Sequence, residues 1–256
     1  MRVFLTGASS GIGRALALEL ARRDPRLTIA LVARRRAELE RLAAELPQAT
    51  VEVHPIDVTD GAALRAAGES FAATHGTPDV VIANAGISAG TLTEQVSDRD
   101  VFARILATNV VAMFDTFAPF AAAMRARRAG RLVGIASVSG IRGLPGGGAY
   151  CASKAAAISY LESLRVELHG SGVRVVTIAP GYIRTPMTAV NRFPMPFLMD
   201  ADRFAARAAD AIERGRSYVV IPWQMAIVAK LLRMLPNPLF DAAFARAPRK
   251  ARPGDA

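Results

Sequence analysis

The chain has 256 residues, of which 52% are hydrophobic and 21% charged, and its formal net charge is +10. This length and composition indicate one globular domain and exclude a disordered chain. The positive charge permits an anionic partner, but the basic residues are spread along the chain and only three of the 32 are lysines, so we expect no nucleic-acid binding.

An apolar run, Val3 to Leu5, begins almost at the first methionine and leads straight into a glycine-rich turn, Thr6 to Gly13. No signal peptide is recognisable, and no stretch reaches the roughly 18 uninterrupted apolar residues of a spanning helix. A single cysteine, Cys151, allows no internal disulfide. We therefore expect a cytoplasmic protein.

Short apolar or β-branched runs alternate with helical patterns along the chain. The runs that predict strands cover residues 3–5, 28–32, 51–53, 80–82, 132–135, 173–178 and 218–221. The patterns that predict helices cover residues 14–23, 37–46, 62–73, 99–128 and 152–168. This alternation predicts an α/β fold in a single domain, residues 1–256: a Rossmann-like, doubly wound parallel sheet of about seven strands with helices on both faces.

The glycine-rich turn lies where the first strand passes into the first helix, which is the phosphate-binding position of such a sheet. Gly7 permits the tight turn, Gly11 lets the backbone approach a pyrophosphate, and Gly13 lets the helix pack closely. We therefore expect a dinucleotide to be bound by the residues of this turn, namely Gly7, Ser9, Ser10, Gly11, Ile12 and Gly13.

The end of the second strand indicates which dinucleotide is bound. A chain that binds NAD usually has an acidic residue there, but this sequence continues with Arg34 and Arg35. Arg34, with Arg35 as a further candidate, can pair with a 2′-phosphate. The sequence therefore favours NADP over NAD, whereas Arg36 is interpreted as the start of a solvated helix.

Lys154 follows Tyr150 by four residues, which is one helical turn, so the two side chains can share one face. A free tyrosine, with a pKa of about 10, is a poor acid or base near neutrality, but a neighbouring cation favours the phenolate. The pair is therefore a candidate proton donor and acceptor beside a bound nicotinamide.

With the turn and this pair, the chain resembles the short-chain dehydrogenase/reductase family, NADP-preferring type, over nearly all of residues 1–190. Ser137, thirteen residues before Tyr150, and Asn109, in the long predicted helix, fall at the family's spacing. The resemblance implies four catalytic residues, Asn109, Ser137, Tyr150 and Lys154. Ser137 would bind the substrate oxygen, Asn109 would support a proton-relay water, and Lys154 would also bind the nicotinamide ribose, so Tyr150 and Lys154 belong to the cofactor site as well.

Further cofactor residues are implied by the same resemblance. Asp57 and Val58 would lie beside the adenine ring, and the motif Asn84, Ala85 and Gly86 next to the ribose, with Ala83 in place of the asparagine that opens the longer form of this motif. The segment after the sixth strand would contact the nicotinamide half through Pro180, Gly181, Ile183 and Thr185.

These motifs predict an NADP(H)-dependent oxidoreductase that interconverts a ketone and a secondary alcohol. An insert at residues 186–215 contains the apolar residues Met187, Phe193, Met195, Phe197, Leu198 and Met199, which indicate an apolar or lipid-like substrate or, equally, an ordinary core. The alternative function is an NADP-binding regulatory or scaffold protein without turnover.

A C-terminal extension, residues 222–256, has two short apolar runs followed by a basic end. Such a segment can lie in a membrane interface, close the substrate pocket or pack between subunits. Membrane contact would suit a lipid-like ketone such as a 3-keto acyl or 3-keto sphingoid compound. The family also implies a homodimer or homotetramer through the helices around 99–128 and 152–168, and His54, His75 and His169 have no partners at metal spacing, so no metal site is expected.

Overall fold

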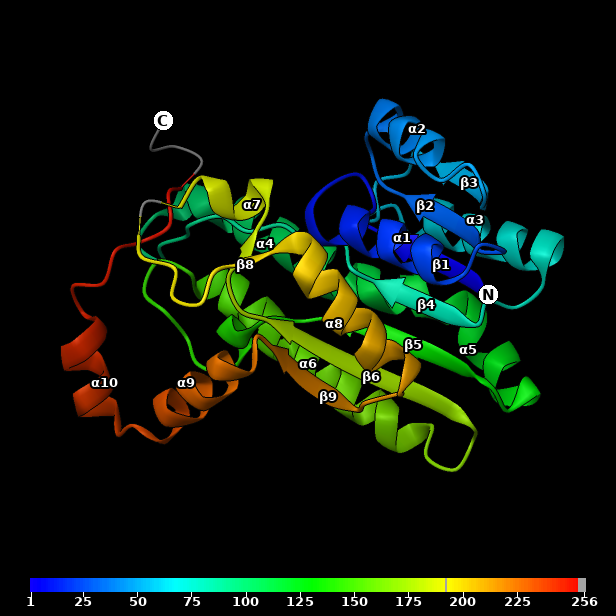
Figure 1. Ribbon diagram of the computed structural model, residues 1–256. Helices are drawn as coiled ribbons and strands as arrows, with labels where there is room; N and C mark the ends of the chain where they lie inside the picture. Colours follow the sequence, from blue (N-terminus) through cyan, green and yellow to red (C-terminus); the bar gives the residue numbers. More distant parts are fainter. Residues whose placement is uncertain (192, 253–256) are drawn as a thin grey trace.

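The computed structural model describes residues 1–191 and 193–252 and contains a parallel sheet of seven strands (Figure 1). Their order is β3-β2-β1-β4-β5-β6-β9, which reverses beside β1 as in a doubly wound sheet. The strands are β1 (Arg2–Thr6), β2 (Thr28–Val32), β3 (Thr50–His54), β4 (Val80–Ala83), β5 (Gly130–Ile135), β6 (Val173–Pro180) and β9 (Tyr218–Ile221). Each predicted strand is present in the sheet, which confirms the predicted fold class.

Helices cover both faces of the sheet because alternate strand residues enter different cores. In β1, for example, Val3 and Leu5 enter the core under one group of helices, and Phe4 enters the other. The first group is α1 (Gly11–Arg23), α2 (Arg36–Ala44) and α8 (Ala201–Glu213), and the second is α3 (Gly61–His75), α5 (Ala112–Arg127) and α6 (Gly148–Glu167).

The predicted helix over 99–128 is divided in the structure. A π-helical turn, Ala107–Val111, separates α4 (Arg99–Leu106) from α5. The helical run Val96–Arg127 is the one helix in the described part of the chain that is long and apolar enough to cross a membrane, but half of its most apolar window is buried inside the protein. The core helix of a soluble protein can have the same length and hydropathy, so this run is weak evidence for a membrane span.

The predicted insert and extension form further elements after β6. The insert contains α7 (Pro186–Ala189), the short strand β8 (Met199–Asp200), which pairs with β7 (Ile183–Arg184) just before the insert, and α8, which packs on α1. The extension contains α9 (Trp223–Met234) and α10 (Asn237–Phe244), which lie to one side of the sheet in Figure 1. Residue 192 of the insert and residues 253–256 of the extension lie outside the described residues.

Candidate active site

A cavity of about 630 Å³ lies at the carboxyl ends of the strands, where a doubly wound sheet binds its ligand. It brings together residues that are as much as 181 positions apart in the chain, from Gly7 to Thr188. Of the predicted site residues, all except Asn109 line it, namely Gly7, Ser9, Ser10, Gly11, Ile12, Gly13, Arg34, Asp57, Val58, Asn84, Ala85, Gly86, Ser137, Tyr150, Lys154, Pro180, Gly181, Ile183 and Thr185.

The glycine-rich turn is fixed by its backbone and by Asn84. Gly7 and Gly11 have φ of +69° and +54°, which side chains disfavour, and a Cβ on Gly13 would collide with the carbonyl oxygen of Gly7. Nδ2 of Asn84 donates to the carbonyl oxygens of Thr6, at 2.9 Å, and Gly7, at 3.2 Å. The three glycines thus keep side chains off part of the turn at the start of α1, so that backbone N–H groups can approach the pyrophosphate of a dinucleotide.

Two arginines give the next part of the cavity a positive charge. Nη2 of Arg35 donates to Oγ of Ser9 at 3.0 Å, so this guanidinium lies against the glycine-rich turn. Arg34, 68% exposed, lies with Nη1 3.7 Å from Oδ2 of Asp57. Burial acts to raise the pKa of Asp57, but hydrogen bonds from Thr59 and the charge of Arg34 outweigh it and lower this pKa. Arg35, the second candidate from the sequence, is thus the arginine bonded to the turn.

Half-buried Tyr150 and buried Ser137 lie together at the other end of the cavity. Tyr150 lies in the first turn of α6, and Ser137 lies before a short helix, Val138–Gly140, where its Oγ accepts a hydrogen bond from the backbone N–H of Ser139 at 3.1 Å. Burial raises the pKa of the Tyr150 phenol, while a hydrogen bond with Ser137 acts in the opposite direction. The phenol therefore holds its proton near neutrality.

Lys154 lies beside the Tyr150 ring, with Nζ 5.9 Å from the ring centroid. Nζ donates to the carbonyl oxygen of Ile135 at 2.8 Å, and no hydrogen bond joins it to the phenol within the described residues. Burial lowers the pKa of Lys154 to about 8. The expected lowering of the tyrosine pKa by Lys154 is therefore absent from this arrangement, in which burial has the larger effect on Tyr150.

Asn109 lies in the π-helical turn and is buried behind the cavity wall. Its Oδ1 accepts from the N–H of Ile87 at 2.8 Å, and its Nδ2 donates to the carbonyl of Ile87 at 3.0 Å and to Oγ of Ser153 at 2.9 Å. Ser153 in turn donates to the carbonyl of Tyr150 at 2.7 Å. Asn109 thus joins the loop after β4 to α6. The role of Ser153 as the link between Asn109 and Tyr150 was not predicted from the sequence, although Ser153 lies about one helical turn after Tyr150.

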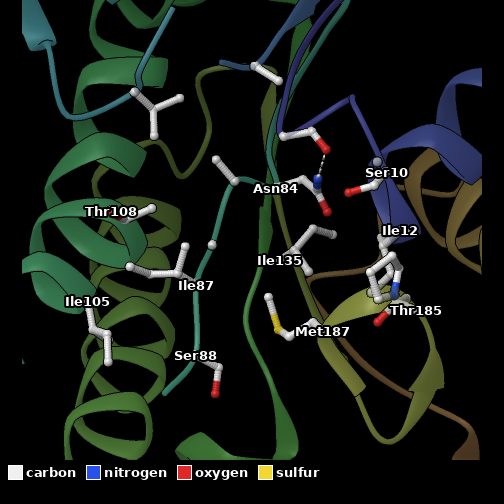
Figure 2. A pocket seen from close by; sticks show the side chains of 18 of the residues that line it. Ser10, Ile12, Asn84, Ile87, Ser88, Ile105, Thr108, Ile135, Thr185 and Met187 are labelled. Atoms are coloured by element: carbon white, nitrogen blue, oxygen red, sulfur yellow. Dashed lines mark hydrogen bonds between the residues drawn. The ribbon is translucent and has the colours of Figure 1, made fainter. Parts of the chain in front are cut away.

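The remaining walls of the cavity are largely apolar. Figure 2 shows Ile87, Ile105 and Thr108 on one side and Ile12, Thr185 and Met187 on the other. Of the apolar residues predicted in the insert, Met187 lines the cavity, whereas Phe193 packs near the ring of Tyr182, with centroids 6.3 Å apart. Among the described residues, no group of three or more His, Cys, Asp or Glu could hold a metal ion.

Comparisons with known proteins agree with this arrangement. The family model described as short chain dehydrogenase matches residues 1–194. An uncharacterized oxidoreductase from Myxococcus xanthus is 43% identical over 94% of this chain and 95% of its own length. A short-chain dehydrogenase from Sphingobium yanoikuyae in complex with NADPH is similar with a TM-score of 0.77 at 28% identity, over 92% of this chain and 96% of that chain. An alcohol dehydrogenase from the archaeon Thermococcus sibiricus, complexed with 5-hydroxy-NADP, has a TM-score of 0.75 at 26% identity, over 86% and 95% of the two chains.

Proposed function

Since the chain belongs to the short chain dehydrogenase family and is an NAD(P)-dependent oxidoreductase, we propose that it uses NADP(H) to interconvert a ketone and a secondary alcohol. The observation that carries this proposal is the cavity of about 630 Å³ that joins the glycine-rich turn to Ser137 and Tyr150. The apolar wall formed by Ile87, Ile105 and Met187 supports an apolar or lipid-like substrate.

The proposed chemistry assigns one role to each polar group at the catalytic end. A bound nicotinamide supplies the hydride in the reducing direction. Oγ of Ser137 holds the substrate oxygen, and Oη of Tyr150 donates its proton to that oxygen as negative charge develops there. Lys154, whose pKa of about 8 lies near neutrality, can exchange a proton with the site. Asn109 positions the loop and the helix that hold these groups.

The preference for NADP(H) rests on the two arginines near Ser9. Charge-assisted hydrogen bonds from Arg34 and Arg35 would stabilise a 2′-phosphate at this end of the cavity. The Sphingobium structure contains NADPH and the Thermococcus structure contains an NADP derivative, which supports the same preference.

A fluorescence titration with NADPH and NADH tests this preference. We expect Arg35→Glu and Arg34→Glu to weaken NADPH binding by about tenfold or more while NADH binding changes little, because NADH lacks the 2′-phosphate. Arg36→Glu is the matched control, since Arg36 is exposed and does not line the cavity. Its Nη1 lies 3.5 Å from Oε1 of Glu40. Equal losses of NADPH and NADH binding in the Arg35 and Arg34 variants would contradict the assignment.

The catalytic assignment is tested by Tyr150→Phe in a ketone-reduction assay with NADPH. Loss of the donated proton should lower kcat by about 10²- to 10⁴-fold while the Kd for NADPH is unchanged. Tyr160→Phe, on the same helix but away from the cavity, is the control. Retained turnover in Tyr150→Phe would refute the assignment, and tight NADPH binding by the wild type without turnover on a panel of apolar ketones would favour the regulatory alternative.

Self-association is also part of the proposal. Helices α4 to α6 expose Phe102, Phe114 and Val166, an apolar surface that would support a homodimer or homotetramer. A cytoplasmic location stays a prediction.

A further inference from the structure

The outer face of α9 carries a stripe of apolar side chains that are more than half exposed. Trp223, Ile227, Leu231 and Met234 are 61%, 51%, 63% and 79% exposed, and their spacing of three and four residues puts them on one side of the helix. Leu239 of α10 is 58% exposed and adds a fifth apolar side chain. We refer to these five residues as the α9 stripe.

The inner face of α9 is fastened to the catalytic half of the molecule. Met225 and Ala229 are buried. Met225 packs closely on Gly181, since a Cβ added to Gly181 would lie 2.7 Å from Cγ of Met225. At the other end of the helix, Nη1 of Arg142 donates to the carbonyl oxygens of Leu232 and Leu235, each at 2.6 Å. The α9 stripe is therefore presented on a helix that is held at both ends.

Arg142 also joins α9 to α10. Its Nη2 donates to Oδ1 of Asn237 at 2.9 Å, and its guanidinium carbon lies 3.9 Å from the centroid of the Phe240 ring. The two helices form a corner beside the sheet in Figure 1. Arg142 thus fixes the position of α10, and with it Leu239, relative to α9.

The charge around the stripe favours an anionic occupant. Lys230 is exposed next to Ile227 and Met234 on the helix surface and makes no ion pair within the described residues. Within α9 and α10 the sequence has two cationic side chains, Lys230 and Arg233, and one acidic one, Asp241. A helix with an apolar face, a tryptophan and flanking cations has the properties of a segment that lies in the interface of an anionic membrane.

The size of the stripe argues against a second copy as its occupant. A helix of 12 residues is about 18 Å long, and five side chains on it and its neighbour fall short of the roughly 800 Å² per partner that a stable protein interface buries.

We infer that the α9 stripe docks the protein on the surface of an anionic lipid bilayer. Because α9 contacts the short helix Val138–Gly140 that follows Ser137, docking places the catalytic end of the cavity near the lipid. A lipid-like ketone could then enter the cavity from the bilayer. This route rests on the proposed function, whereas the docking itself requires no catalysis.

The single tryptophan of the chain makes docking directly measurable, since Trp223 lies in the stripe. The full-length wild type, without nucleotide, is mixed with vesicles of phosphatidylcholine that contain about 30% phosphatidylserine, or with phosphatidylcholine alone. We expect co-sedimentation and a blue shift of the Trp223 emission with the anionic vesicles, and quenching by brominated lipid. Binding should weaken as salt is added.

Two variants locate the docking surface. Ile227→Ser with Leu231→Ser should weaken vesicle binding by about tenfold or more, because it removes the centre of the apolar stripe. Lys230→Gln should weaken it by about fivefold, the effect of one cation near an anionic surface. The control is Val96→Ser, which removes an apolar side chain that is 85% exposed and lies outside α9 and α10, and which should leave vesicle binding unchanged.

Three results would overturn the inference. The first is no binding of the wild type to anionic vesicles. The second is equal binding by the wild type and the variant with Ile227→Ser and Leu231→Ser. The third is a Trp223 emission that depends on protein concentration without lipid, with a smaller native mass in that variant, since this would show that a second copy covers the stripe. NADPH binding by every variant, measured separately, confirms folding and separates a failure of docking from a failure of the proposed function.

Discussion

The glycine-rich turn and the C-terminal segment both flank the cavity region, but different forces hold them in place. The turn depends on backbone conformation, with Gly7 and Gly11 at positive φ and Gly13 against the carbonyl of Gly7. The C-terminal segment depends on arginine side chains that reach across the molecule, such as Arg142 on the end of α9 and Arg252 on Asp98, at 2.8 Å. A change in the turn should therefore affect ligand binding and folding together, while a change in the segment should act locally.

The largest effect is expected for Gly13→Ala. The new Cβ would overlap the carbonyl oxygen of Gly7, which belongs to the backbone and cannot move without reshaping the turn. We expect destabilisation of about 1–3 kcal/mol, as for other overpacked sites, and the loss of measurable NADPH binding. Thermal unfolding and NADPH fluorescence measure the two effects.

Gly148→Ala is the matched control for this substitution. Gly148 begins α6, and a Cβ there would have no neighbour within 4 Å. The free energy of unfolding of the Gly148→Ala variant should equal that of the wild type or be slightly higher. If Gly13→Ala behaved like Gly148→Ala, the turn would be less constrained than its geometry indicates.

A buried charge at the catalytic end provides the second test. Lys154 has a pKa of about 8 in the folded protein against 10.5 when exposed, so below pH 8 it is charged in both states and its burial destabilises the fold. As the pH rises from 8 to 10.5, the folded state releases this proton first, and the contribution of Lys154 to the free energy of unfolding should increase by about 3 kcal/mol across that window.

Denaturant unfolding of the wild type and of Lys154→Met, at several pH values from about 7 to 10, isolates this contribution. The difference in unfolding free energy between the two proteins should rise in favour of the wild type over the window. Lys230→Met removes one positive charge from the exposed surface of α9 and serves as the control. A difference that does not vary with pH would show that Lys154 is solvated in the folded protein.

The contrast between the two regions also explains what the sequence could predict. The strands and the turn depend on local patterns, so their positions in the sheet and the cavity follow from residues close together in the chain. Arg142 is 90 positions from Leu232, and Asp98 is 154 positions from Arg252, and no local pattern relates such residues. The sequence indicated the apolar character of the extension but not which face of α9 is buried.

Within the cavity, the sequence predicted which residues meet but not how each is bonded. The role of Asn109 beside a relay water stays a prediction, and the bonds of its side chain to Ile87 and Ser153 could not be read from the sequence. Lys154 was expected against the phenol, but its ammonium bonds the carbonyl of Ile135. These details depend on backbone groups of other elements, which a pattern of side chains does not describe.

The smallest effect is expected in the C-terminal segment, for Arg142→Ala. The substitution removes the donors to the carbonyls at the end of α9, at a cost of about 1–2 kcal/mol that is confined to α9 and α10. Amide hydrogen exchange should accelerate by about tenfold or more in residues 223–244 while exchange in the sheet is unchanged.

The variant Arg142→Lys should show nearly the same accelerated exchange as Arg142→Ala, because an ammonium cannot reproduce the planar fork of donors. Arg165→Ala, at an exposed pair with Glu162, is the control. If Arg142→Ala instead accelerated exchange in the sheet and weakened NADPH binding as Gly13→Ala should, the segment would be part of the same cooperative unit as the turn, and the distinction between the two regions would fail.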